Sequence, residues 1–481
     1  MNSGGDSVPA GAVDAVEYLA SQPPELRVPD ALEKIRHQVS ESGRRLAVLD
    51  DDPTGTQTVH GVPVLTTWTV EDLRWALEQP SSTFYILTNS RSFPEDEAAG
   101  MNREISSNLA SAAEETGTGV AIVSRGDSTL RGHYPAETDA LEEGLGSDFD
   151  GVVLCPCYLE AGRLTVDDIH WVRQGERLVP AGETEFASDA SFGYSSSDLA
   201  AWVEEKTAGR VQASEVASVG LSDIREGGPE RIAEVLLGVG GGRPVVVNAA
   251  SYADLEVFVL GLLDAEERGK RFLYRTGPSF VRVRGGISEK GPLGAEELYG
   301  GRPRRGHGLV LVGSHVEMTT RQLERALALD GVMSIELSVP RLLDAGERDG
   351  ELERVVSEVN RGLIEAEVVV YTSREVVHGG ATGFEIGVSV SDALVEVMRR
   401  VDRELPLAFV VAKGGITSSD VGTRGLGVRR AEVAGQMLPG IISVWILPDD
   451  SAFPGLPYVI FAGNVGEEDS LARVIEILRE G

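Results

Sequence analysis

The chain has 481 residues, with 76 acidic and 44 basic side chains and a formal net charge of −32 at pH 7. Nucleic acids are bound mainly through clustered Lys and Arg, so this acidity argues against a nucleic-acid partner. No apolar run approaches the ~20 residues that span a bilayer, and the first residues lack a basic and apolar leader. We therefore expect a cytoplasmic protein with no membrane partner.

The length exceeds the roughly 100 to 200 residues of a single domain, which favours at least two domains. Only two cysteines occur, Cys155 and Cys157, on either side of Pro156 in an apolar segment. Two cysteines exclude a disulfide framework, and no histidine lies at a zinc-finger spacing from them. We expect both thiols to be buried and structural.

Short β-branched runs alternate with longer segments of helical period, which is typical of parallel sheets covered by helices. The expected strands, in chain order, are 46–49, 84–87, 120–123, 152–154, 245–247, 309–312, 368–371, 409–411 and 459–461. The expected helices include 95–115, 252–267, 318–329, 351–365 and 389–401. This order predicts an α/β protein with two three-layer α/β/α domains, mostly parallel sheets and an active-site cleft between the domains.

Two stretches interrupt the alternation. Residues 1–30 are rich in Gly, Pro, Ser and acids and are expected to form a tail or a loosely attached helix. Residues 286–305 are dense in Gly, Pro and charge and are expected to form a linker. The predicted domains are therefore residues 31–285 and residues 306–481.

Three adjacent acids, Asp50, Asp51 and Asp52, follow the first expected strand and are followed by Pro53-Thr54-Gly55. The carboxyl ends of parallel strands form the ligand crevice of an open sheet, so these carboxylates are well placed for chemistry or for Mg²⁺. Asp, Pro, Thr and Gly also make ordinary turns and helix caps. A turn needs only one acid, however, so three that repel one another favour a functional role.

A second polar block follows the strand at 120–123 and is flanked by arginines after the neighbouring strands. Guanidinium groups bind carboxylates in a bidentate manner, and hydroxyl and Asp side chains bind sugar hydroxyls, so this recurrence predicts a pocket for a carboxylate or a polyol. The candidate substrate-binding residues are Arg91, Arg125, Asp127, Ser128, Thr129, Arg131 and Arg163.

Three glycine turns in the second half each join an apolar strand to a helical segment. Backbone N–H groups in such turns can hold phosphate, although glycine also permits close packing alone. The candidate nucleotide-binding residues are Ser314, Lys413, Gly414, Gly415, Thr417, Ser418, Gly463, Asn464 and Gly466. Lys413 is either a phosphate neutraliser or a surface lysine at a strand end. Neither a Walker A sequence nor a GxGxxG after a strand occurs, so the predicted nucleotide site is of another type.

Together these blocks resemble, in content and order, the four-carbon acid sugar kinase family. The N-terminal motifs are a DDxTG turn (Asp51 to Gly55), a DSTLRG block (Asp127 to Gly132) and a Pro…GR segment (Pro156 to Arg163). The C-terminal motifs are Gly313-Ser314, a GGxTS turn (Gly414 to Ser418), a segment at 426–441 and GNxG (Gly463 to Gly466). This chain departs from the family where Ile416 replaces the usual Glu, where Thr56 follows the first turn, and where Arg125 replaces the usual Lys.

The resemblance implies an N-terminal substrate domain, a C-terminal ATP domain, and phosphorylation of a threonate-, erythronate- or oxo-tetronate-like acid at its terminal hydroxyl. It implies ATP and Mg²⁺ as cofactors and leaves a homodimer open. By the same resemblance, the glycine turns and Ser314 hold the nucleotide phosphates, and Asp51, Asp52, Arg125, Asp127 and Arg131 face the acid. Phosphoryl transfer needs positioning more than covalent chemistry. We therefore hypothesise that domain closure brings the γ-phosphate to the substrate hydroxyl, and that Asp51 or Asp52 is the base that accepts the hydroxyl proton.

Two other functions remain open from the sequence. Asp50, Asp52 and Thr54 satisfy the DxDxT pattern of a haloacid dehalogenase-type phosphatase, with Lys413 and the pair Asp449-Asp450 as later elements. That interpretation leaves the DSTLRG and glycine-turn motifs unexplained. A two-lobed sensor of small acids is the third interpretation, and it would bind the acid without turning over ATP.

Overall fold

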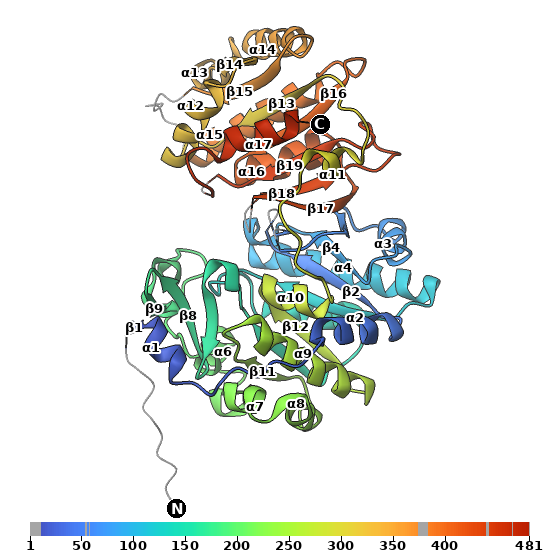
Figure 1. Ribbon diagram of the computed structural model, residues 1–481, viewed down its shortest axis with the longest axis vertical. Coiled ribbons are helices and arrows are strands. Elements are labelled where there is room, and N and C mark those ends of the chain that lie inside the picture. Colours follow the sequence, from blue (N-terminus) through green and yellow to red (C-terminus); the bar gives the residue numbers. More distant parts are fainter. Residues whose placement is uncertain are drawn as a thin grey trace, which may run out of the picture. The chain divides into compact units, whose positions relative to one another are not determined.

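The computed structural model describes residues 11–52, 55–56, 58–373, 383–438, 442–463 and 465–480 (Figure 1). The chain separates into two compact units, which we call unit 1 (Met1–Gly55 and Thr67–Glu289) and unit 2 (Thr56–Thr66 and Lys290–Gly481). The chain therefore passes between the units three times. A short segment from the N-terminal half, residues 56–66, belongs to unit 2.

Unit 1 is built on a parallel sheet with the strand order β10-β11-β6-β12-β5-β2-β4. Its strands are almost wholly buried, as expected for a parallel sheet covered on both faces. The strands are β10 (Ala217–Val219), β11 (Arg243–Val247), β6 (Gly151–Cys155), β12 (Phe272–Thr276), β5 (Val120–Arg125), β2 (Arg45–Asp50) and β4 (Thr83–Leu87).

The helices of unit 1 fall into two groups, because right-handed crossovers in opposite directions place helices on opposite faces of a sheet. In the first group α3 (Val70–Leu77), α4 (Glu95–Thr116) and α5 (Ala136–Leu145) contact one another. The second group forms around α9 (Tyr252–Glu267). It comprises α2 (Ala31–Glu41), α7 (Leu221–Arg225), α8 (Gly228–Leu237) and α10 (Pro278–Arg284).

A small antiparallel sheet, in the order β1-β9-β8-β7, is added to unit 1. Its strands are β1 (Val13–Asp14), β9 (Arg177–Pro180), β8 (Ile169–Gln174) and β7 (Arg163–Val166), and α1 (Ala15–Ala20) follows β1. The Tyr18 ring lies 5.2 Å from that of Trp171, and its hydroxyl donates to Asp167 at 2.6 Å. Residues 13–20, where the sequence predicted a tail or a loosely attached helix, are thus part of the packed structure and include the helix α1.

Unit 2 has a mixed sheet in the order β3-β17-β18-β19-β16-β13-β15-β14, antiparallel from β3 to β19 and parallel from β19 to β14. Its strands are β3 (Val62–Leu65), β13 (His307–Val312), β14 (Val332–Leu337), β15 (Glu367–Thr372), β16 (Leu407–Lys413), β17 (Arg430–Leu438), β18 (Ile442–Ile446) and β19 (Pro457–Phe461). The Thr56 hydroxyl lies 2.9 Å from that of Ser443 and accepts from the Trp445 indole at 3.3 Å. These bonds fix the start of the N-terminal segment against β18.

Helices cover both faces of the unit 2 sheet as well. Contacts join α12 (Glu317–Leu327), α17 (Ser470–Arg479) and α11 (Ala295–Tyr299) in one group. The other group comprises α13 (Val339–Leu343), α14 (Arg348–Gly362), α15 (Gly383–Arg399), α16 (Gly415–Asp420) and the π-turn Val421–Gly425. Residues 286–305, expected to be a linker, include α11 and the buried Leu293, whose N–H donates to the Gln436 carbonyl at 2.7 Å.

The predicted α/β class with mostly parallel sheets is confirmed, and each expected strand and helix coincides with an observed one. The strands that the sequence did not indicate are the short or antiparallel ones and the parallel strands β12 and β14. Both cysteines are free and buried, as expected. Within the described ranges, no helix has the length and apolarity needed to cross a membrane.

One buried carboxylate ties the C-terminal helix of unit 2 to its sheet. Glu367, at the start of β15, is 4% exposed and binds the Arg479 guanidinium at 2.8 Å and that of Arg304. Removing one partner of a buried ion pair leaves the other charge uncompensated, which costs far more than losing an exposed pair.

We expect Glu367→Ala to lower the free energy of unfolding by about 3 kcal/mol, because two partly buried guanidinium groups lose the buried anion that pairs with them. The control is Glu353→Ala, which removes an exposed pair with Arg400 and should change stability by less than about 0.5 kcal/mol. Thermal melts of both variants measure this. Equal effects of the two changes would contradict the role given to Glu367.

Candidate functional site

Charged side chains gather at the carboxyl ends of adjacent strands of unit 1. Asp50 ends β2, Arg125 ends β5 and Arg275 is the penultimate residue of β12. Arg91 follows β4 in the short turn Ser90–Ser92, and the loop 126–132 follows β5. Strands β12, β5, β2 and β4 are neighbours in the sheet, so parallel topology alone brings these residues to one edge.

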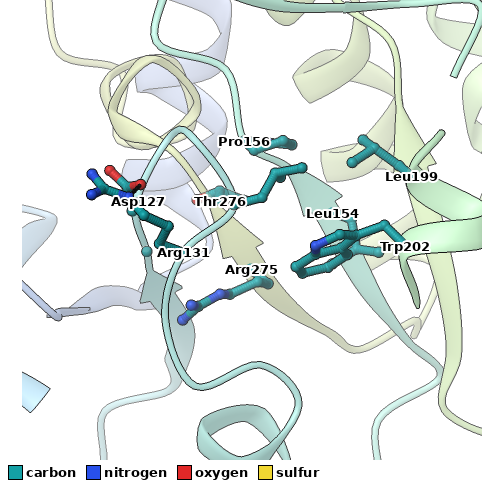
Figure 2. A pocket seen from close by; sticks show the side chains of 10 residues that line it. Asp127, Arg131, Leu154, Pro156, Leu199, Trp202, Arg275 and Thr276 are labelled. Carbon is teal, nitrogen blue, oxygen red and sulfur yellow. Dashed lines mark hydrogen bonds and ion pairs between the residues drawn. The ribbon is translucent and has the colours of Figure 1, made fainter. Parts of the chain in front are cut away.

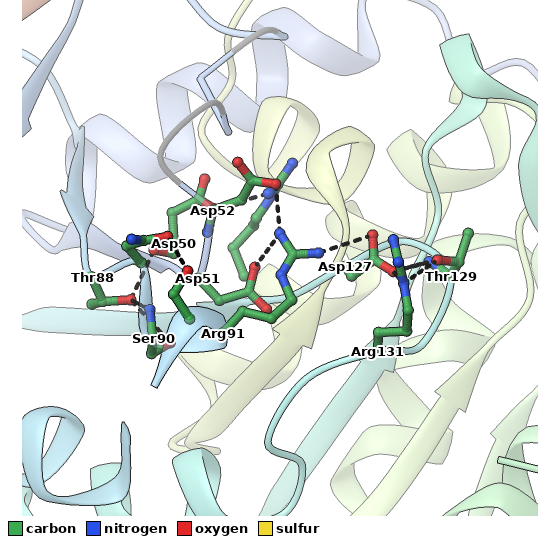
Figure 3. A network of polar contacts seen from close by, with 12 residues as sticks. Asp50, Asp51, Asp52, Thr88, Ser90, Arg91, Asp127, Thr129 and Arg131 are labelled. Atoms are coloured by element: carbon green, nitrogen blue, oxygen red, sulfur yellow. Dashed lines mark hydrogen bonds and ion pairs between the residues drawn. The ribbon is translucent and has the colours of Figure 1, made fainter. Parts of the chain in front are cut away.

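Arg91 joins three of the predicted site residues (Figure 3). Its guanidinium lies 2.5 Å from Asp52, 3.4 Å from Asp51 and 3.3 Å from Asp127. The Arg91 side chain is 17% exposed, so these attractions are only weakly screened by water. The first acidic block and the DSTLRG block, far apart in sequence, thus form one network.

Asp50, the first of the three acids, is a structural ion-pair partner. Its side chain is fully buried, and Oδ1 accepts from Arg125 at 2.8 Å and from the Asp52 N–H at 3.0 Å. Burial raises the pKa of Asp50 to about 6, although Arg125 opposes the shift. The Asp50 carboxylate therefore holds the backbone of the turn that carries Asp51 and Asp52.

Asp51 has a different environment. Its side chain is 2% exposed, and within the described residues neither carboxylate oxygen has a hydrogen-bond partner. Burial raises its pKa to about 7, while Arg91 acts in the opposite direction. Asp52, whose side chain is 31% exposed, binds the Arg91 guanidinium at 2.5 Å. Asp51 is thus the carboxyl group poised to exchange a proton near neutral pH.

The DSTLRG loop is ordered by Asp127. Its Oδ2 accepts from the Arg131 Nε at 2.8 Å and from the Thr129 hydroxyl. Burial would raise the pKa of Asp127, but Arg91 and Arg131 outweigh it and hold the pKa at about 2. Ser128 has another role: its carbonyl accepts at 2.7 Å from the Nε2 of His170, whose pKa burial lowers to about 4.

Sequence reasoning missed Arg275 and Glu137. The Arg275 Nη1 donates to Glu137 and to the Ser124 hydroxyl, each at 2.7 Å, and the Ser90 hydroxyl donates to Glu137 at 2.5 Å. A Cβ at Gly126 would lie 2.6 Å from the Arg275 guanidinium, so glycine is needed there. A charged residue near the end of an apolar strand was the available signal, as it was for Arg125.

A pocket lies next to the Asp127–Arg131 loop (Figure 2). Leu154, Pro156, Leu199 and Trp202 form its apolar side, and Asp127, Arg131 and Arg275 contribute charge. The apolar lining comes from β6, the turn after it and α6 (Leu199–Lys206), and Leu130 of the loop adds to it.

Arg163, the first residue of β7, differs from the other predicted arginines. Arg91, Arg125 and Arg131 each pair with a carboxylate, whereas Arg163 makes no ion pair within the described ranges, and its Nε is buried without a hydrogen-bond partner there. Its guanidinium lies 5.8 Å from the Phe186 ring centroid, and that of Arg131 lies 5.2 Å from the same centroid. Burial lowers the pKa of Arg163, and the nearby Asp127, Tyr158 and Glu185 offset this shift only in part. The Arg163 Nη1 donates to the Ala161 carbonyl, a neutral acceptor, so the described ranges give the guanidinium no carboxylate partner.

The three glycine turns of unit 2 follow three adjacent parallel strands, β13, β16 and β19. The Thr319 hydroxyl donates to the Gly463 carbonyl at 2.7 Å and lies 3.1 Å from the Ser314 hydroxyl, which joins the first turn to the third. Gly414 has φ +128°, and a Cβ there would lie 3.0 Å from Thr417 Oγ1 and 3.4 Å from Ser314 Cβ. The turns therefore make a narrow cradle that side chains would fill.

Other predicted residues of unit 2 serve the frame of this cradle. Ser418 is buried, and its hydroxyl donates to the Gly415 carbonyl at 3.0 Å. Gly466 adopts φ +84°. Asn464 lies outside the described residues. Ile416, at the family's Glu position, is 59% exposed.

Lys413 is a buried residue. It is 0% exposed, and its ammonium donates to the Ala462 carbonyl at 3.0 Å and lies 3.7 Å from the Phe461 ring centroid. The surface-lysine interpretation is therefore wrong. Burial lowers the pKa of Lys413 to about 7.

The family resemblance implies Mg²⁺ as a cofactor. Among the described side chains there is no group of three or more His, Cys, Asp or Glu residues that could hold a metal ion. We therefore assign no residue to it.

Two domain models match the chain in sequence. A sugar-binding N-terminal domain matches residues 46–284, and a nucleotide-binding C-terminal domain matches residues 309–471. The chain belongs to the four-carbon acid sugar kinase family. The first match contains the network around Arg91, and the second contains the three glycine turns.

Curated relatives and a solved structure agree with this membership. A D-erythronate kinase of Heliobacterium modesticaldum is 25% identical over 73% of this chain and 78% of its own length. A 3-oxo-isoapionate kinase of Paraburkholderia graminis is 30% identical over 35% of this chain and 37% of its own length. A Haemophilus influenzae protein from a domain-of-unknown-function family has a TM-score of 0.64 at 20% identity, covering 90% of this chain and 99% of that one, which shows the same fold.

We expect Asp51→Asn to stabilise the protein at pH 8 and to have little effect at acidic pH. A raised folded-state pKa means that the protonated carboxyl contributes stability below its unfolded pKa of about 4, and that this contribution is lost as the pH rises to about 7. Asn does not ionise, so its advantage should grow between pH 5 and pH 8 to on the order of 2 kcal/mol.

Thermal melts of wild type and Asp51→Asn across this range measure the difference. Asp264→Asn, on the exposed surface of unit 1, is the control and should show no such growth. A difference that stays constant with pH would refute the buried, protonated state of Asp51.

Proposed function

We propose that this protein is an ATP-dependent kinase that phosphorylates a hydroxyl, at the terminal carbon, of a small acid sugar. Family membership and the two kinase relatives, named for erythronate and 3-oxo-isoapionate, support the reaction class. The observation that carries the proposal is the cradle of three glycine turns at the ends of adjacent parallel strands in unit 2.

The residues of the three glycine turns fit the phosphates of a nucleoside triphosphate. The conformation of Gly414 and its short distances to Ser314 and Thr417 leave space for phosphate oxygens where a side chain would otherwise lie. Ser314, Gly414, Gly415, Thr417, Gly463 and Gly466 would hold the phosphates. When bound, ATP supplies the γ-phosphoryl group.

Arg163 would hold the carboxylate of the acid sugar. The other predicted arginines already have protein carboxylates, so Arg163 is the cation that a substrate anion would compensate. Arg131 lies against the same Phe186 ring and provides a second donor toward the same region. Asp127 and Thr129 would bind sugar hydroxyls.

Asp51 is the proposed general base. A base works best when its pKa lies near the working pH, and burial brings the pKa of Asp51 to about 7. Arg91, 3.4 Å away, would orient the carboxylate, and Asp52 would keep Arg91 in place.

The phosphatase alternative fits the structure less well. Its nucleophile would be Asp50, whose side chain is fully buried and already engaged by Arg125 and the Asp52 N–H. A Cβ at Gly55 would lie 1.8 Å from Asp50 Oδ2, so the backbone also covers this carboxylate. Thr54, part of the same pattern, lies outside the described residues.

Coupled detection of ADP tests the function, using four- to six-carbon aldonates and the corresponding alditols as acceptors. We expect ADP release only with the acids. Arg163→Met should raise KM for the acids by about 10- to 100-fold, since a charge-assisted hydrogen bond is lost. Arg173→Met, a change at an exposed arginine of the neighbouring β8, is the control.

ATP consumption without an acceptor would refute the kinase. Trapping of a phosphoaspartate at Asp50 would favour the phosphatase instead. An unchanged preference for acids in Arg163→Met would refute only the assignment of Arg163.

The pH dependence of the reaction tests the base. Because Asp51 accepts a proton only when ionised, kcat should rise with pH and level off above about 7. Asp51→Asn should lower kcat by at least about 100-fold and leave ADP affinity unchanged. Asp52→Asn should keep the rising limb. A fully active Asp51→Asn enzyme would exclude Asp51 as the base.

A further inference from the structure

Lys413 contacts all three glycine turns of unit 2. It directly precedes Gly414 in the second turn. Its backbone carbonyl accepts from the N–H groups of Gly313 at 3.1 Å and Ser314 at 3.4 Å in the first turn. Its ammonium donates to the carbonyls of Ala462 at 3.0 Å and Gly463 at 3.4 Å in the third. No other residue of the predicted site has this position.

The ammonium fixes the orientation of the third turn. A trans peptide is planar, with its C=O and N–H on opposite sides, so holding the Ala462 carbonyl toward Lys413 directs the Gly463 N–H away from it. The Gly463 carbonyl also accepts from Thr319, which lies against Ser314. The two donors on Gly463 therefore set the third turn against the first.

The charge of Lys413 has no protein counter-ion in the described part of unit 2. Strands β13 and β19 and helix α16 pack against β16. Their titratable groups are His307, which lies 3.6 Å from Glu367, Tyr458, which donates to the Ser418 carbonyl, and Asp420, which binds Ser391 and Arg424. Burial is the sole cause of the lowered pKa of Lys413, so none of these groups offsets its charge.

A buried ammonium without an anion is costly, and an anion bound nearby would relieve that cost. Phosphate oxygens at the three turns would be such an anion, separated from the ammonium by the peptide groups that it holds. The protonated form would then become favoured on binding, by an amount equal to the gain in affinity that protonation gives.

We infer that Lys413 is a positioning residue whose buried ammonium is the counter-charge for the nucleotide phosphates, so that nucleotide binding takes up a proton. This inference rests on the proposed function, in which the phosphates occupy the three turns. It makes the affinity for nucleotide pH-dependent even though Lys413 does not reach the ligand.

Calorimetric titration with ADP at pH 8, in buffers of different ionisation enthalpy, tests the inference. The terminal phosphate of unbound ADP, with a second pKa near 6, is already ionised at this pH, so an uptake of protons reports on the protein. We expect uptake of up to about one proton per ADP in wild type, and affinity that falls up to about tenfold per pH unit above pH 7.

Three variants separate charge from fold. Lys413→Met should bind ADP more weakly at pH 7, take up no proton and show no pH dependence. Lys413→Arg keeps a permanent charge, so it should bind without proton uptake. Lys290→Met, which changes a half-exposed lysine of unit 2, should behave as wild type.

The outcomes for the two proposals are distinct. Tight ADP binding to wild type without proton uptake and without pH dependence would overturn the inference and leave the kinase proposal standing, even if Lys413→Met did not fold. Failure of wild type to bind ADP at any pH would instead overturn the nucleotide site itself.

Discussion

The guanidinium of Arg91 compensates a concentration of negative charge that unit 1 could not otherwise keep. Asp51, Asp52 and Asp127 lie within 3.4 Å of it. Asp50, which directly precedes Asp51 in the sequence, is paired with Arg125. Buried carboxylates repel one another and lose hydration, so each needs a cation or a proton. The arginines supply cations for Asp50, Asp52 and Asp127, and burial raises the pKa of Asp51 to about 7, above the value of about 6 for Asp50, so Asp51 takes a proton more readily.

Unit 2 buries a positive charge where unit 1 buries negative ones, and it compensates that charge differently. Its buried charge is a cation, and the structure compensates it with carbonyl dipoles and the face of the Phe461 ring instead of an acid. Dipoles stabilise a buried ammonium less well than a carboxylate does, which is why burial depresses the pKa of Lys413. Within the described residues neither Lys413 nor Arg163 forms an ion pair with a carboxylate, which suits the anionic ligands that we propose.

Much of the fold and site could be predicted, because each polar block directly follows a strand with a clear apolar run. Asp51, Arg125 and Gly414 were found in this way, and parallel topology brought each to a sheet edge. Arg275 was missed because the run that carries it, FLYRT, was not recognised as a strand. Thr319 was missed because its contact with Gly463 joins segments 144 residues apart, which no local pattern indicates.

The role of Lys413 also lay beyond the sequence. A lysine before a glycine turn is equally compatible with solvent and with phosphate, and only its packing beneath Ala462 and Gly463 excludes the first. The ionisation of the three adjacent acids could not be predicted from the sequence either. Asp50, Asp51 and Asp52 have the same side chain and differ only in what surrounds them.

The membership of β3 in unit 2 limits how this protein can be divided. A fragment that starts at Lys290 would hold the helices and most of the sheet of unit 2, but it would lack Val62–Leu65, the antiparallel partner of β17. β17 would then lose its partner along Arg430–Val433, and the unpaired backbone groups of that open edge are a template for aggregation. An isolated nucleotide-binding half would therefore need residues 56–66 supplied in trans or grafted by a new connection, and gene fission at the apparent boundary would be disfavoured.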